Sequence, residues 1–469
     1  MSAALPDACR RGPEGAGRPL ALFERAMYVD GREAVNISVA ASIRGPIVEE
    51  RLRRALGRVQ AKHALLRCLI VRREGRPWFE PRAPAPPIPL RIVERRRGDD
   101  WIEATRSELR RRFDGSRQPL ARLTWIRGES QSELLLVCHH AICDGRSLLT
   151  LLREILLLCD RPDGDIGDDD ALHAVEELLP AAVRADRRLR RRVGWQVAAL
   201  KGALRVARIV RPRRVWTYGE AYQRFWTLDE PDARRFVERC RAEEVSVFAA
   251  MSLAFMLAFR AVRGSRAIRE LVAPVDVRRF LPELRADGLF AIAPTVSLPM
   301  SGLPDGAPGE VAAFWAAARA LKQGMDGRID RLAPTVHARF LGMERLHGVY
   351  DAMAVYGRSR RAGRRVSLSY LGRIDLPRDY RDFRLEAVRG ISAMLAPTPA
   401  HLVVISSFGG RFELSLASDE TSLPRAQGRA VQERATEILC ISAAGAALRD
   451  VSRDHEARAA SRAGVAERA

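Results

Sequence analysis

The sequence predicts an α/β protein built from two halves, because strand-like and helix-like segments alternate along most of its length. Three observations support this fold class. The 469 residues are enough for two or three compact domains. Hydrophobic residues make up 47% of the chain and charged residues 29%, which is ordinary globular usage. Both halves mix strands and helices in comparable amounts without a short-period repeat. We therefore expect a folded, soluble α/β duplex.

The first half alternates short apolar runs with amphipathic segments. Residues 36–43 alternate as a half-buried strand does, and residues 47–62 then have apolar side chains at helical spacing. Residues 134–138 are apolar throughout, which predicts a fully buried strand. A helix that is apolar nearly all round is expected at 147–158. The other elements expected here are strands at 66–71, 90–93 and 120–127 and a helix at 101–113.

The second half contains the longest nearly apolar stretch, Val245 to Phe259. This stretch is shorter than the roughly 17–25 residues of a membrane-spanning helix, so it predicts a buried helix. Gly409 and Gly410 predict a hairpin between strands 402–407 and 412–417. The other elements expected here are strands at 225–228, 270–275, 292–298 and 366–370 and helices at 232–243, 309–325 and 334–347.

Composition divides the chain into five segments. Residues 1–18 are rich in Gly, Pro and Arg, which predicts a disordered leader without a secretory signal. Residues 184–214 hold twelve Arg and Lys residues against one acid, and their apolar residues recur at helical spacing. They predict a basic amphipathic helix and linker between two lobes. The lobes are then residues 19–183 and 215–440, and an Ala- and Arg-rich tail follows over 441–469.

The formal net charge of +21 favours anionic partners through its long-range field. Only three of the 79 basic residues are lysines, as a very GC-rich coding sequence would produce. No nucleic-acid-binding motif or aromatic platform accompanies the arginines, so we expect no nucleic acid, whereas binding to an anionic membrane surface stays open. The seven cysteines are scattered and lack metal-ligand spacing. We expect reduced thiols, no metal site and a cytoplasmic location.

The segment that carries chemistry is HHAICDG, from His139 to Gly145. Strand ends in α/β proteins line crevices, and a neutral imidazole with a pKa of about 6.5 can accept a proton there. Adjacent strand residues face opposite sides, so only one of His139 and His140 faces a crevice. Backbone amides at a helix start would hold Asp144, which needs a cation if it is buried. Gly145 either leaves room for a substrate or permits a tight turn.

This segment resembles the His-His-x-x-x-Asp-Gly signature of the chloramphenicol acetyltransferase-like acyltransferases, which include nonribosomal peptide condensation domains and polyketide-associated acyltransferases. The resemblance extends over residues 20–440, because three further segments match in the expected order. They are KHALLR at 62–67, PVDVRR at 274–279 and SYLGR at 369–373. In the last segment Tyr370 stands where the family usually has Asn.

The resemblance implies two chloramphenicol acetyltransferase-like lobes that form a pseudo-dimer, with a tunnel between them and His140 near its middle. It implies that His140 is the general base or positions the acceptor, that Asp144 pairs with Arg278 and holds the loop, and that His139 supports it. With Gly145, these residues would make up the catalytic segment. Of the other matched positions, His63, Arg67 and Asp276 would brace or orient the site, and Ser369, Tyr370 and Gly372 would line an oxyanion site or the tunnel. Ser369 is equally well explained as an ordinary strand residue.

The implied activity is acyl transfer from a thioester to a hydroxyl or amine, forming an ester or amide in secondary-metabolite or lipid biosynthesis. The donor would be acyl-CoA or the phosphopantetheine arm of an acyl or peptidyl carrier protein, with direct transfer and no permanently bound cofactor. No adenylation or thiolation module accompanies the domain, so we expect a stand-alone monomer. Two alternatives stay open: a catalytically silent relative that docks a carrier protein, and a lipid acyltransferase on an anionic membrane.

Overall fold

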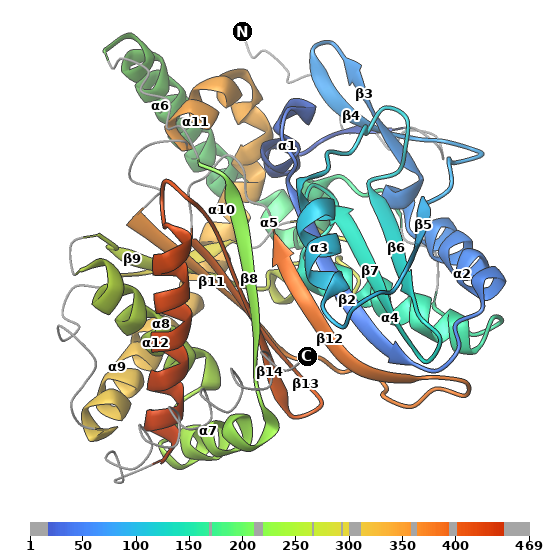
Figure 1. The fold of residues 1–469 in the computed structure, drawn as a ribbon. Coiled ribbons are helices and arrows are strands. Elements are labelled where there is room, and N and C mark those ends of the chain that lie inside the picture. The colour runs from blue at the N-terminus through green and yellow to red at the C-terminus, as the bar shows by residue number, and fades with distance from the viewer. Residues whose placement is uncertain are drawn as a thin grey trace, which may run out of the picture.

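Two β-sheets with helices packed against them form two lobes that lie side by side (Figure 1). The computed structural model describes residues 17–167, 171–210, 219–264, 267–291, 294–299, 311–357, 364–393 and 401–444. Most of the predicted leader, most of the predicted tail and the last residues of the predicted linker, 211–214, lie outside this set. The α/β class and the two lobes are as the sequence predicts.

The sheet of the first lobe has the strand order β12-β2-β7-β6-β5. Strand β2 pairs antiparallel with β7 from Asn36, opposite His139, to Arg44, opposite Gln131. Strand β7 is buried over nearly its whole length, as its continuous apolar run predicts. The elements of this lobe are β2 (Asn36–Arg44), α2 (Glu49–Lys62), β5 (Leu90–Glu94), α3 (Asp100–Arg110), β6 (Ala121–Arg127), β7 (Gln131–His139) and α4 (Gly145–Asp160).

The sheet of the second lobe has the order β10-β9-β11-β13-β14-β8. Helix α8 lies in the hydrophobic core of this lobe. Every side chain from Ala249 to Phe259 is buried, so the predicted buried helix is confirmed. Ala, Leu, Met and Phe fill this space without a polar face. The elements are β8 (Ala221–Leu228), α7 (Glu230–Ala242), α8 (Val247–Arg263), β9 (Glu270–Pro274), β10 (Thr295–Pro299), α9 (Val311–Asp330), β11 (Arg365–Arg373), β13 (His401–Phe408), β14 (Arg411–Asp419) and α12 (Arg425–Ala444).

Strand β12 (Arg384–Ala393) crosses from the second half of the chain into the first sheet (Figure 1). It pairs antiparallel with β2, from Arg384 opposite Arg44 to Ala393 opposite Ile37. The Ser415 hydroxyl of β14 donates to the Ile391 carbonyl of β12 at 2.7 Å, which also ties the strand to the second sheet. The prediction of lobes that are contiguous in sequence is corrected here, because residues 215–440 supply one edge strand of the first lobe.

A third packing centre lies around the basic helix α6 (Arg187–Val210), which the sequence places between the lobes. Its Val193 and Val197 pack with residues of α10 (Leu332–Met343). The remaining elements are β1 (Arg18–Pro19), α1 (Leu22–Tyr28), η1 (Val29–Gly31), η2 (Ala64–Arg67), β3 (Cys68–Arg73), β4 (Arg76–Pro81), η3 (Val175–Leu178), α5 (Ala181–Ala185), η4 (Arg278–Phe280), η5 (Glu344–Val349) and α11 (Tyr350–Gly357).

The helices of the described residues were compared with the requirements of a membrane span. None of them alone is both long enough and apolar enough. Helices α7 and α8 meet the length and composition requirement only as a pair, and they are bent by 110° at the break between them.

Candidate active site

Strand β7 delivers the two histidines to the place where the lobes meet. The N–H of His139 donates to the Leu120 carbonyl and that of His140 to the Val35 carbonyl, both at 2.8 Å. The chain then turns through three buried residues, 141–143, into helix α4. Two backbone hydrogen bonds therefore hold the residues that lead into this turn.

His139 ends β7 with its side chain in the core, where it is 2% exposed. Its Nδ1 accepts a hydrogen bond from the Ala141 N–H at 3.1 Å, and its ring packs against Tyr28 and Phe113 with centroid distances of 5.6 and 6.1 Å. Burial lowers the pKa of His139 to about 3. His139 is therefore a neutral side chain that shapes the turn, a placement that agrees with the supporting role expected of it.

His140 follows directly and, unlike His139, is a residue of intermediate exposure. Burial lowers the pKa of His140 below its ordinary value of 6.5, although backbone hydrogen bonds from His140 and Cys143 and the charge of Asp144 oppose the shift. The imidazole is therefore neutral at pH 7, and one ring nitrogen has a lone pair that can accept a proton. Of the two adjacent histidines, His140 is the less buried.

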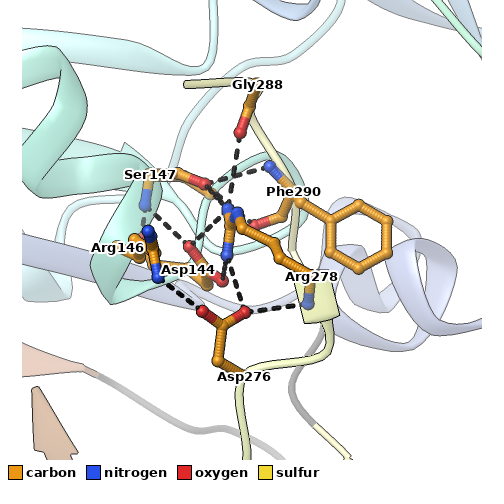
Figure 2. Close-up of polar contacts among 8 residues, drawn as sticks. Asp144, Arg146, Ser147, Asp276, Arg278, Gly288 and Phe290 are labelled. Atoms are coloured by element: carbon orange, nitrogen blue, oxygen red, sulfur yellow. Dashed lines mark hydrogen bonds and ion pairs between the residues drawn. The ribbon is translucent and has the colours of Figure 1, made fainter. Parts of the chain in front are cut away.

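Asp144 is the N-cap of α4, and it forms an ion pair with an arginine from the second half of the chain (Figure 2). Its Oδ1 accepts the Ser147 N–H at 2.7 Å, and its Oδ2 lies 2.8 Å from Nη1 of Arg278. The two side chains are only 14% and 7% exposed. Burial alone would lower the pKa of Arg278, but the charges and hydrogen bonds of Asp144 and Asp276 together outweigh it and raise that pKa. The pair expected from the resemblance is thus present.

Ser147 completes this junction, and sequence reasoning missed it. Its hydroxyl donates to the Phe290 carbonyl at 3.2 Å and accepts the Phe290 N–H at 3.0 Å and Nη2 of Arg278 at 2.9 Å. The Asp144 N–H also donates to the Phe290 carbonyl, at 2.7 Å, and Arg278 donates to the Gly288 carbonyl at 3.4 Å. One signal could have found Ser147: it is a hydroxyl residue three positions after the N-cap in a helix that is otherwise apolar on its inner side.

Asp276 lies at the edge of this junction (Figure 2). Its Oδ1 accepts the Arg278 N–H at 3.0 Å, and its Oδ2 lies 2.8 Å from Nη1 of Arg146. Burial opposes ionisation, but the hydrogen bond from Arg278 and the two guanidinium charges hold the pKa of Asp276 below its ordinary value. Asp276 therefore orients the backbone from which Arg278 projects.

Gly145 makes room for a side chain of the second lobe. A Cβ atom at Gly145 would lie 2.7 Å from Cδ2 of Leu371. Leu371 reaches this position because β11 has a bulge between Tyr370 and Gly372, and Gly372 has a φ of +72°, which favours glycine. A tight turn was one of the two expected roles of Gly145. It does not explain the glycine, because the φ of Gly145 is not positive. The glycine permits a close contact between α4 and β11.

The other two matched positions of β11 lie beside this bulge. Tyr370 stacks on Phe248 of α8 with a centroid distance of 5.8 Å and an interplanar angle of 11°, and burial raises its pKa. Ser369 is opposite Val404 of β13. The stacked ring explains how an aromatic residue replaces the usual Asn. The oxyanion role of Ser369 and the tunnel itself stay predictions.

His63 and its neighbour Lys62 brace the first lobe from behind α4. His63 caps the end of α2, is fully buried, and has its Nε2 2.7 Å from Oε2 of Glu154 on α4. Nζ of Lys62 lies 2.6 Å from Oε1 of Glu154 and 2.7 Å from Oδ2 of Asp287, just before Gly288. Sequence reasoning found His63 but not Lys62, which links the first lobe to the segment that holds Arg278.

Arg67 ends η2, is half-buried, and accepts the Arg82 N–H on its carbonyl at 3.0 Å.

In the described part of the chain no group of three or more His, Cys, Asp or Glu side chains could hold a metal ion. The six cysteines of that part are free thiols. The positions brought together at the junction are therefore His140, Asp144, Gly145, Asp276 and Arg278, with Leu371 from the bulge.

Comparison with known families identifies the first lobe. Residues 25–163 match the Condensation domain family. Cyclosporin synthetase from Tolypocladium inflatum is 32% identical over 122 residues, and bacitracin synthase 2 from Bacillus licheniformis is 26% identical over 148 residues. These alignments cover 26% and 30% of the chain but only 1% and 6% of those synthetases.

Solved structures extend the likeness to both lobes. The trichothecene 15-O-acetyltransferase of Fusarium sporotrichioides has a TM-score of 0.67 at 13% identity, covering 94% of this chain and 99% of its own. The first condensation domain of the calcium-dependent antibiotic synthetase has a TM-score of 0.65 at 17% identity, covering 92% and 97%. Polyketide synthase associated protein 5 of Mycobacterium tuberculosis has 0.61 at 16%, covering 91% and 98%.

The sequence match and the fold therefore agree. At these identities the solved structures establish the fold of the two lobes and nothing finer. Residues 25–163, which include the His139–Gly145 segment, match the Condensation domain family, and the whole chain has the two-lobed fold of condensation domains and related acyltransferases.

Proposed function

We propose that the protein is an acyltransferase that moves an acyl group from a thioester to the oxygen or nitrogen of a small-molecule acceptor. The observation that carries this proposal is the geometry of His140. It is a neutral imidazole on a residue of intermediate exposure, next to a loop that an interlobe ion pair holds in place. The names of the similar proteins, an acetyltransferase and peptide synthetases, are consistent with this class of reaction.

His140 acts as the general base or as the group that positions the acceptor. The acceptor O–H or N–H donates to the imidazole while its oxygen or nitrogen attacks the thioester carbonyl. A C–O or C–N bond forms and the C–S bond breaks. The departing thiolate takes the proton from the imidazole and leaves as a thiol. Because a thioester is already activated, alignment and assisted proton loss can supply much of the rate acceleration.

Asp144 has a positioning role and does not accept the proton. Its two oxygens are engaged by the Ser147 N–H and by Arg278. The Asp144–Arg278 pair and the hydrogen bonds to Phe290 therefore fix the loop from which His140 projects.

The donor in this proposal is acyl-CoA or the phosphopantetheine arm of a carrier protein. Both are anionic, and the net charge of +21 would attract either of them. The product would be an ester or amide, as in secondary-metabolite or lipid biosynthesis. No resident cofactor takes part in the step.

The test is intact-mass detection of acyl loss from a panel of acyl-CoA and acyl-carrier donors, with alcohols and amines supplied in turn. We expect acyl transfer that depends on both the donor and the acceptor, and that is lost in His140→Ala. Tight carrier-protein binding without any acyl transfer across the panel would instead identify the chain as a catalytically silent docking relative.

A further inference from the structure

Helix α6 lies at the periphery of the molecule, away from both sheets (Figure 1). One face of it is buried, through Val193 and Val197. The opposite face carries Trp195 and Val206, which are 80% and 61% exposed. Residues eleven positions apart lie almost in line on an α-helix, so these two side chains form one outward stripe. The residues between them on that face are small: Ala198, Ala199 and Gly202.

The same helix is uniformly basic. It contains eight Arg and Lys residues and no acid in 24 residues. Five of these are in the first six positions, and Arg188, Arg191 and Arg192 lie on the side of the stripe that begins with Trp195. A helix with an exposed Trp, a small apolar stripe and flanking arginines has the composition of helices that lie in the interface of anionic membranes.

An apolar groove runs beside this helix, between α6 and α10. Its volume is about 590 Å³, and its walls include Val197, Leu200, Ala338 and Met343. Arg192 and Arg339 also line it. Such a groove suits a hydrocarbon chain whose anionic headgroup stays near the two guanidinium groups.

We propose that α6 docks the protein onto an anionic lipid bilayer. Trp195 and Val206 enter the boundary between headgroups and acyl chains, Arg188 and Arg191 contact lipid phosphates, and the groove beside Arg192 receives a lipid acyl chain. An acidic protein partner would also complement the arginines, but the apolar groove beside the stripe is of a size to hold a hydrocarbon chain, which favours lipid. The proposal does not depend on the acyl-transfer reaction.

The experiment is co-sedimentation of the full chain with vesicles of phosphatidylglycerol and phosphatidylcholine at a ratio of 1:3, roughly the anionic fraction at which basic helices bind. The triple variant Arg188→Gln, Arg191→Gln, Arg192→Gln should bind about 100-fold more weakly, since each basic residue near the surface contributes about a fivefold change. Trp195→Ala should bind about tenfold more weakly. Circular dichroism confirms that each variant is folded.

A matched control removes the same charge elsewhere. The variant Arg53→Gln, Arg54→Gln, Arg235→Gln also lowers the net charge by three, at exposed positions of α2 and α7. It should bind vesicles within about twofold of the wild type, because those positions lie outside the docking helix.

Three results would overturn the proposal. The wild type could sediment equally with pure phosphatidylcholine vesicles, or the control variant could lose as much binding as the α6 variant. In the third result, the α6 variant keeps its vesicle binding but no longer binds an acidic acyl carrier protein, which would assign the helix to a protein partner.

Discussion

The start of α4 in the first half and strand β11 in the second half meet at the same junction but contribute different things. Asp144 and Ser147 are held by an ion pair and by hydrogen bonds that reach across to Arg278 and Phe290. Strand β11 contributes an apolar contact, because its bulge places Leu371 against Gly145. The two lobes therefore meet directly beside His140, through polar contacts on one side and an apolar contact on the other.

The largest expected effect tests the ion pair between Asp144 and Arg278. Arg278→Ala should lower the free energy of unfolding by about 3–5 kcal/mol, because Asp144 would remain largely buried without a cation. Urea unfolding measures the loss. The adjacent and exposed Arg279→Ala is the matched control and should change the stability by less than about 0.5 kcal/mol. Equal stabilities of the two variants would contradict the structural role of the pair.

The second prediction concerns the imidazole itself. His140→Ala should reduce acyl transfer by roughly 10²–10⁴-fold, the usual contribution of a general base, with an unchanged urea midpoint. The contrast with Arg278→Ala separates chemistry from support, because only the latter should unfold more easily. Near-normal turnover by the His140 variant would remove the base assignment.

The third prediction tests the contact between Gly145 and Leu371 by adding a methyl group at position 145. Gly145→Ala should destabilise the protein by at most about 1 kcal/mol, because its Cβ forces the end of the Leu371 side chain to move, while alanine favours the helix. Leu371→Ala in the same chain should relieve most of this loss, so the double-mutant cycle should give a clear coupling energy. Additive effects would mean that the two residues do not restrain each other.

The last prediction separates the buried His139 from the exposed His173 by pH. His139 titrates at about 3 in the folded protein and at about 6.5 when unfolded, so the unfolded state binds the extra proton. Its contribution to stability is complete above pH 6.5 and falls by about 1.4 kcal/mol per pH unit as the pH drops below that value. His139→Phe should reduce this slope, measured by urea unfolding between pH 7 and 5. The exposed His173→Ala should keep it, and identical slopes in all three proteins would contradict the assignment.

Local patterns predicted most of the elements and the central pair. The apolar run before His139 gives β7, the Asp144 N-cap gives the start of α4, and the Pro-Val-Asp context singled out Arg278. These features depend on neighbours in sequence. The strand and the N-cap follow from spacing and residue type, whereas the pairing of Arg278 with Asp144 was implied by the resemblance to the acyltransferase family.

What the sequence could not predict depends on partners far along the chain. Nothing local marks residues 384–393 as the edge strand of a sheet built mostly from residues before 140. The acceptors of Ser147 are backbone atoms of Phe290, which carry no residue-specific signal. The contact between Leu371 and Gly145 depends on a bulge whose position follows from pairing with β13.

The crossing of β12 also has a consequence for synthesis of the chain. Until the ribosome has made residue 393, β2 has an open edge, and the sheet behind the two histidines lacks its last member. The first 163 residues, which carry the family signature, therefore emerge as an incomplete domain whose exposed strand invites pairing with other chains. The sheet behind His139 and His140 is therefore completed only when a distant part of the polypeptide has been made.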